Sequence, residues 1–121
     1  MARAWIETRT KRYTPAAAGT TALFSLAKGQ AVIAAFARVD VARVAGTSVT
    51  VGDGSDVDGL FTETELASTA AGRKAGAGAY LAASGGKIYN VADTVDAVLT
   101  GTPTTMPNIV FEILILNTSL K

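Results

Sequence analysis

Short runs in which apolar and polar residues alternate recur along most of this chain, and turn-forming residues separate them. The runs are ALFSL (22–26), QAVIAAFARVDVARVA (30–45), SVTVG (48–52), LFTETEL (60–66), AYLAA (79–83), KIYNV (87–91), TVDAVLT (94–100) and NIVFEILIL (108–116). Alternation with period two turns one face of a strand toward a core and the other toward solvent. About eight strands with no helix long enough for a parallel crossover predict an all-β fold of antiparallel sheets: a β-sandwich, a jelly roll or a small barrel.

The longest run, residues 30–45, predicts one long strand bent by a β-bulge, because β-branched residues are frequent in it. Its alternation assigns one face to Ile33, Ala35, Ala37, Val39 and Val41, and the other to Phe36, Arg38 and Asp40. The turn at Gly46 predicts a hairpin between this run and residues 48–52. Residues 62–71 remain open to a helical turn instead of a strand.

The composition indicates that part of the apolar surface is covered by other subunits. Only 17% of the residues are charged, and the mean hydropathy is +0.31. About 25% charged is usual for a soluble domain. Residues 1–52 carry seven Lys or Arg and two Asp or Glu, whereas residues 53–121 carry four and eight. The first part of the chain is thus basic and the second acidic, a charge distribution that suits packing against copies of the same chain or against an acidic partner.

The chain contains no histidine and no cysteine, which limits the chemistry it can perform. Ser-His-Asp and Cys-His catalytic sites and the usual zinc sites are therefore excluded. We expect no enzyme activity, no metal and no cofactor. The sequence also predicts no signal peptide and no membrane span, because no apolar stretch approaches the length of either.

Residues 1–21 differ from the rest and are interpreted as an extended N-terminal arm, followed by the β domain over 22–121. Aromatic residues and arginine are enriched at the centres of protein interfaces. The arm is therefore predicted to contact other subunits through Arg3, Trp5, Ile6, Arg9, Lys11, Arg12 and Tyr13. Two alternatives stay open: a frayed tail, and a first strand that packs Trp5 into the domain's own core.

An acidic loop at residues 53–59 is the best candidate for a cation site. Asp56, Asp58, Gly59 and Glu65 match four positions of an EF-hand calcium loop, but Gly54 stands where its first aspartate should be. Aspartate and glycine also suit tight turns for conformational reasons, and a plain turn is the preferred reading.

Two further functions have weaker support. The glycines of residues 71–78 meet neither phosphate-loop pattern, which favours a surface loop there. Single-strand nucleic-acid binders use a basic groove lined with stacking aromatics, whereas here the basic cluster lies in one terminal segment. Nucleic-acid binding is therefore not expected.

Four segments in this order resemble small virion proteins of tailed bacteriophages: TSVTVGDGSDVDGLF (47–61), GAGAYL (76–81), SGGKIYNVADTVDAVLTGTP (84–103) and PNIVFEILIL (107–116). The resemblance spans roughly residues 30–116. It implies a capsid decoration (cement) protein with a β-sandwich or jelly-roll fold. Such a protein would form a homotrimer, bind the major capsid protein on the outer surface of the virion head, and stabilise the capsid. A tail, neck or fibre module is the alternative, followed by a carbohydrate- or nucleic-acid-binding β module.

Overall fold

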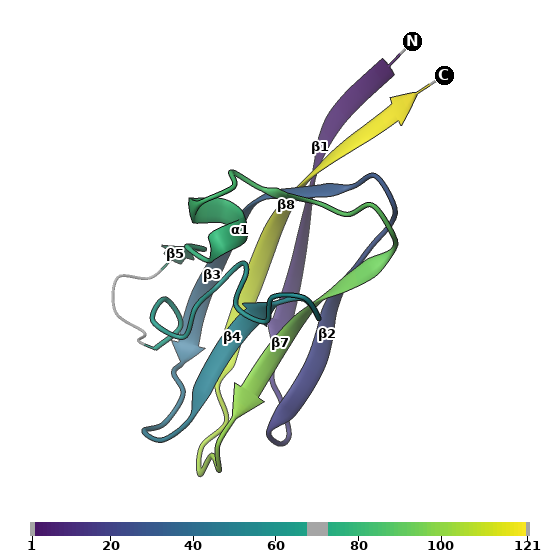
Figure 1. Ribbon diagram of the computed structural model, residues 1–121. Helices are drawn as coiled ribbons and strands as arrows, with labels where there is room; N and C mark the ends of the chain where they lie inside the picture. The colour runs from purple at the N-terminus through teal and green to yellow at the C-terminus, as the bar shows by residue number, and fades with distance from the viewer. Residues whose placement is uncertain (1, 68–72, 121) are drawn as a thin grey trace.

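The computed structural model describes residues 2–67 and 73–120, and these form a sandwich of two antiparallel β-sheets (Figure 1). The five-stranded sheet contains β1 (Ala2–Tyr13), β8 (Asn108–Leu120), β3 (Ala31–Val41), β5 (Arg73–Ala75) and β6 (Lys87–Ile88). Its order is β1-β8-β3-β5, and β6 also pairs with β3. The three-stranded sheet has the order β2 (Gly19–Leu26), β7 (Asp93–Thr100), β4 (Ser48–Gly52). The predicted all-β, antiparallel sandwich is confirmed.

The core lies between the two sheets and is built by alternate residues of the longest strands. From β8 these are Ile109, Phe111, Ile113 and Ile115; from β7 they are Val95, Ala97 and Leu99. The rings of Phe61 and Phe111 meet with their centroids 5.5 Å apart. Each such side chain removes apolar surface from water, which is the main favourable contribution to folding.

Strand β3 follows the predicted alternation in its middle and departs from it at both ends. Ala35, Ala37 and Val39 are buried as predicted. Register shifts occur between Val32 and Ala34 and between Val39 and Val41. Because each bulge reverses the alternation, Val32 replaces Ile33 in the core, and Val41 is exposed.

The predicted hairpin between residues 30–45 and 48–52 is wrong. Strand β4 pairs with β7 in the opposite sheet, from Ser48 opposite Thr100 to Gly52 opposite Asp96. Both edges of β3 are already occupied, one by β8 and the other by β5 and β6. The chain therefore crosses from one sheet to the other through a turn at Gly46, whose φ is +84°.

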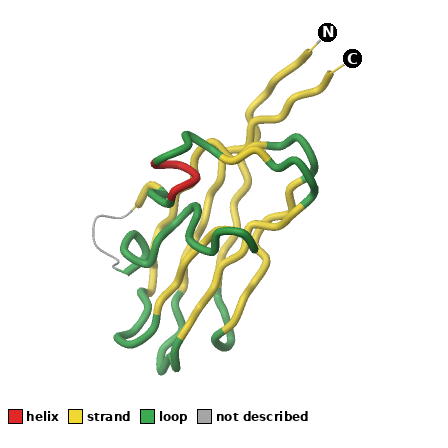
Figure 2. The backbone as a smooth tube through the Cα atoms, in the orientation of Figure 1, coloured by secondary structure: helices red, strands yellow, loops and turns green. Residues whose placement is uncertain are grey.

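Three other predicted strands are shorter or absent. Residues 79–83 form the helix α1 (Ala79–Ala82) and a cap in place of a strand, and strands make up nearly all the remaining regular structure (Figure 2). Residues 60–66 contribute one bridge, between Phe61 and Val51, and then turns. Of 87–91, only Lys87–Ile88 is a strand. Alanine favours a helix wherever packing does not decide, which explains the first difference.

The helix α1 has four residues, and no helix in the described part of the chain has the length and hydropathy to cross a membrane.

Candidate interaction surface

The predicted contact residues lie on β1, which forms one edge of the five-stranded sheet. β1 pairs with β8 at every position from Ala2 opposite Leu120 to Tyr13 opposite Ile109. The segment assigned to an N-terminal arm therefore contributes an edge strand to the five-stranded sheet over Ala2–Tyr13. Odd-numbered positions of β1 lie opposite the residues of β8 that face the core, and even-numbered positions lie opposite those that face away.

Tyr13 belongs to the core and not to the surface. Its side chain is 1% exposed, and its ring centroid lies 6.1 Å from that of Phe111. Burial raises the pKa of its hydroxyl. Tyr13 therefore anchors β1 to the sandwich and cannot contact another subunit in this fold, which corrects its assignment as a contact residue.

Arg9 and Glu7 hold β1 against neighbouring strands. Nε of Arg9 lies 2.8 Å from Oε2 of Glu7, and its Nη1 donates to the Ser25 carbonyl of β2. Glu7 also accepts a hydrogen bond of 3.0 Å from Asn117 of β8. The bonds from Arg9 and then Asn117 lower the pKa of Glu7. Two nitrogens of the Arg9 guanidinium therefore already bond within the domain.

Arg12 joins three strands on the face of the five-stranded sheet that points away from the core. Its Nη1 donates to Asn108 of β8 at 2.6 Å and to Asp40 of β3 at 3.1 Å. Asp40 accepts a second bond of 2.9 Å from Arg38. Hydrogen bonds from Arg38 and then Arg12 lower the pKa of Asp40. Arg12 and Arg38 remain exposed and give this face a positive cluster.

Trp5 and Ile6 are the exposed apolar residues of β1. Their exposed fractions are 50% and 59%. Trp5 lies opposite Asn117, one position past the residues of β8 that pair with β3, and Ile6 lies opposite Leu116, the last residue that does. The alternative in which Trp5 packs into the domain's own core is therefore wrong. Lys11 is exposed as well, and Arg3 lies in β1 opposite Ser119.

The structure adds to this surface residues that the sequence reasoning did not select. On the same side of the sheet as Ile6 lie the half-buried residues Phe36, Val110, Leu114 and Leu116. We call this side the outer sheet face, defined by Ile6, Arg12, Phe36, Arg38, Val110, Glu112, Leu114 and Leu116. The sequence does contain a sign of this surface: the run 108–116 is apolar at the positions of both faces of the strand, so one apolar face is left outside the core.

A shallow recess of 310 Å³ lies on the outer sheet face. Arg38, Arg73, Phe36 and Glu112 are among its lining residues. The guanidinium of Arg73 stacks over Phe36 at 4.3 Å and pairs with Glu112. The outer sheet face thus combines apolar side chains with arginines at its rim, the composition typical of protein interfaces.

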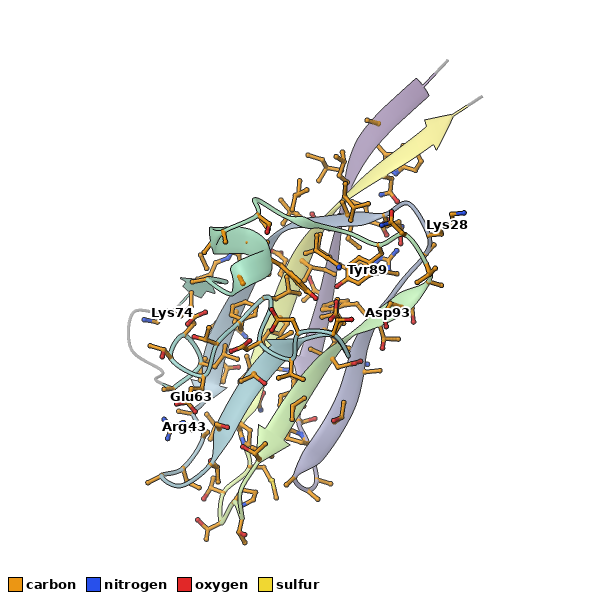
Figure 3. The ribbon with its side chains drawn as sticks, viewed as in Figure 1. Lys28, Arg43, Glu63, Lys74, Tyr89 and Asp93 are labelled. Atoms are coloured by element: carbon orange, nitrogen blue, oxygen red, sulfur yellow. The ribbon has the colours of Figure 1, made fainter. Side chains whose placement is uncertain are left out.

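The acidic loop at residues 53–59 is organised as a turn around Asp53, which is 3% exposed. Its Oδ1 accepts bonds from the amide N–H of Ser55 at 2.9 Å, that of Asp56 at 3.0 Å, and the hydroxyl of Tyr80 at 2.9 Å. Its Oδ2 accepts from the hydroxyl of Tyr89 at 3.1 Å. Tyr89 projects into the body of the molecule, whereas Lys28, Glu63 and Lys74 lie at its periphery (Figure 3).

These hydrogen bonds account for the electrostatics of the loop. Burial acts to raise the pKa of Asp53, but the bonds from Asp56, Tyr80, Ser55 and Tyr89 together outweigh it and lower the pKa. Burial and the adjacent Asp53 raise the pKa of both tyrosines. The Asp53 oxygens are already used by four donors, so the turn reading explains the loop without a cation. The described residues contain no group of three or more side chains placed to bind a metal.

The glycine-rich segment 71–78 lies partly outside the described residues. From Arg73 onward it consists of β5 and a stretch packed against the chain at residues 58–60. The N–H of Gly78 donates to the Leu60 carbonyl at 3.0 Å. A Cβ at Gly78 would lie 2.3 Å from the Asp58 carbonyl oxygen. Close backbone packing explains Gly78 without a bound phosphate.

No family model matches this sequence, and no curated protein sequence matches it. Its fold does match solved structures. A chain of the acidic stable capsid structure of Helicobacter pylori bacteriophage KHP30 matches with a TM-score of 0.68 and 13% identity, over 100% of both chains. A chain of the capsid asymmetric unit of cyanophage Pam1 matches with a TM-score of 0.63 and 11% identity, over 96% of this chain and 86% of that one. This fold is therefore one found in chains of bacteriophage capsid structures, as the sequence resemblance predicted.

Proposed function

We propose that this protein is a structural component of a bacteriophage virion, and specifically a decoration protein that binds the outer surface of the head and stabilises the capsid. The observation that carries the proposal is the full-length match of the fold to a chain of the KHP30 capsid structure. The match to the Pam1 capsid chain supports it independently. The first match covers 100% of both chains, and the second covers 96% of this chain and 86% of the other, so the likeness is not confined to one segment.

The surface of the domain suits this role. The major capsid protein is the proposed partner, and the proposed contacts are residues of β1: Arg3, Trp5, Ile6, Arg9, Lys11 and Arg12. Ile6 and Arg12 belong to the outer sheet face, which would extend the contact from the edge strand. Trp5, Arg9 and Lys11 occupy positions on the other side of β1. A modest contact per copy is sufficient, because a symmetric capsid repeats it many times and simultaneous engagement multiplies the effect.

Self-association as a homotrimer is the second part of the proposal. Ile88 is 62% exposed and Val91 is 70% exposed, and both lie between α1 and β7. These two residues are the candidate trimer contact, since they are large, exposed apolar side chains outside β1. The mass of the protein in solution, measured for the natural chain and for an Ile88→Ser, Val91→Ser variant, tests this contact.

Sedimentation with empty capsids tests the function. Deletion of residues 2–20 is unsuitable, because it would remove β1 and the core residue Tyr13. Lys11→Glu is the sharper variant, and Lys28→Glu is its matched control in the exposed turn between β2 and β3. We expect Lys11→Glu to weaken binding about tenfold or more, because like-charge contacts at an interface are costly. Lys28→Glu should bind normally.

Imaging of labelled protein on intact particles separates the head from other sites. Label over the whole head supports decoration. Label confined to the tail, neck or fibres would replace decoration with the second candidate, and absence of binding to any particle would reject the virion role. Salt-dependent binding to single-stranded nucleic acid, or sugar binding, would favour the remaining alternatives.

A further inference from the structure

β1 is a long, regular sheet edge, and the charged side chains that protect such an edge gather in its C-terminal half, at Arg9, Lys11 and Arg12. It pairs with β8 over twelve residues without a register shift and contains no proline. The other described edge strands are short or irregular. β5 and β6 have three and two residues, β2 contains a bulge, and β4 is bridged to Phe61. Short strands, bulges and covering contacts of this kind normally prevent an edge from pairing with another chain, because a regular free edge can accept another strand.

The N-terminal half of β1 carries the exposed large apolar side chains of this strand. Its end forms a two-stranded ribbon with β8 beyond the rest of the sandwich (Figure 1). Two strands alone are marginally stable in water. Trp5 lies one position beyond the residues of β8 that pair with β3, whereas Ile6 lies opposite Leu116, the last residue that does. The two residues are adjacent and therefore point to opposite faces of β1, and both are at least half exposed. A strand added at the edge supplies a neighbour to both faces at once, whereas a partner docked on one face covers only one.

One antiparallel register of β1 against itself pairs opposite charges and also apolar residues, and it places no like charges opposite each other. With a two-fold axis at Trp5, the two Trp5 residues face each other. Arg3 lies opposite Glu7 of the second copy, and Ala4 lies opposite Ile6 of the second copy. Opposite charges and aromatic or apolar pairs directly across two strands are stabilising. The two-fold axis doubles each pair, as in any isologous interface.

Neighbouring registers are less favourable. An axis at Ile6 places Arg3 opposite Arg9, and an axis at Glu7 places the two Glu7 residues opposite each other. Like charges directly across two strands are destabilising. An axis at Thr8 pairs Glu7 with Arg9 of the second copy. It also places Trp5 opposite Lys11 and Ile6 opposite Thr10, so neither large apolar residue meets an apolar partner.

We propose that two copies of this chain join through their β1 edges, antiparallel about a two-fold axis at Trp5, to form a continuous sheet in the order β8-β1-β1-β8. This contact does not depend on the proposed function. It is separate from the trimer contact at Ile88 and Val91, so both contacts together would give assemblies of six copies or of multiples of six.

Cysteine cross-linking tests the register, and the chain suits this test because it has no cysteine of its own. In a Trp5→Cys variant the two thiols would lie directly opposite each other, so mild oxidation should give a disulfide-linked pair of chains. Thr8→Cys is the matched control on the same strand. Its two copies would lie about 20 Å apart in this register, because each residue advances a strand by about 3.3 Å. Linkage at residue 5 but not at residue 8 supports the proposal; no linkage at residue 5, or equal linkage at both, overturns it.

Charge reversal tests the pairing without altering Trp5. We expect Arg3→Glu to weaken association of the two copies about tenfold, since it replaces two attractive pairs with two repulsive ones. Lys11→Glu makes the same change outside the paired stretch and should leave association unchanged. Equal association of both variants would contradict the pairing. Lys11→Glu is the variant predicted to lose capsid binding, so failure of this inference and failure of the proposed function remain distinguishable.

Discussion

The hydroxyl of Tyr89 donates a hydrogen bond of 3.1 Å to Oδ2 of Asp53, and this bond links two segments 36 residues apart in the chain. Tyr80 donates to the other oxygen of the same carboxylate at 2.9 Å. Asp53 therefore fastens α1 and the residue after β6 to the loop that follows β4. One buried carboxylate organises a region with little regular secondary structure.

Removing these bonds should destabilise the domain in unequal steps. We expect Tyr89→Phe to lower the free energy of unfolding by about 1–2 kcal/mol, because it removes one bond to a charged acceptor. Asp53→Ala should cost about 3 kcal/mol or more, because it leaves four donors without their acceptor. Urea unfolding of both variants and of the double variant measures the coupling. Additive losses would contradict a direct interaction.

The same carboxylate should make the stability depend on pH. The pKa of Asp53 in the folded protein is lowered. A lowered pKa means that its contribution is fully present above the unfolded value of about 3.9 and is lost as the pH falls through the folded value. Unfolding measured between pH 7 and pH 2.5 should show this loss below about pH 4. Asp53→Asn should show a shallower decline over that range, and an unchanged decline would contradict the assignment.

Tyr13 offers a different test, because its buried hydroxyl has no hydrogen-bond partner among the described residues. Tyr13→Phe removes this unsatisfied group and keeps the ring against Phe111. We expect its stability to equal or exceed that of the natural chain, since a buried polar group without a partner is costly. Tyr13→Ala should lose about 3–5 kcal/mol, as other large aromatic truncations in cores do. Thermal unfolding compares the variants, and a marked loss in Tyr13→Phe would indicate a partner for the hydroxyl.

The sequence was sufficient to predict the fold class, because alternation of period two persists through the strands that build the core. It was not sufficient where the local apolar pattern conflicts with a bulge in the strand or with the pairing of strands in the whole sheet. Val41 continues the apolar pattern but follows a bulge, so the backbone turns it to solvent. The run at 48–52 satisfies the pattern of a hairpin strand equally well in either sheet, and only the occupied edges of β3 decide against the nearer one.

The candidate surface was predicted in part for a similar reason. Trp5 and Ile6 are exposed as their assignment to an interface requires. Tyr13 carries the same residue chemistry, and only the register of β1 against β8 places it in the core. Leu114 and Leu116 alternate with the buried Ile113 and Ile115, and local alternation identifies two faces without saying which of them another layer covers.

Gly78 gives the last test, at a position where the backbone itself is packed closely. Its φ is −65°, which any residue can adopt, so space and not conformation is the reason for glycine. A Cβ there would lie 2.3 Å from the Asp58 carbonyl oxygen and 2.4 Å from the Gly59 carbonyl carbon. Because backbone atoms cannot rotate away, Gly78→Ala should separate α1 from the acidic turn and lower the free energy of unfolding by about 1–3 kcal/mol.

Gly54→Ala is the matched control for Gly78→Ala, since no atom lies within 4 Å of a Cβ at Gly54. It should be neutral or stabilising by up to about 1 kcal/mol, because alanine restricts the unfolded chain. Urea unfolding of the two variants side by side separates crowding from the general effect of replacing glycine. Equal changes in both variants would mean that the contact between Gly78 and residues 58–59 is looser than the structure places it.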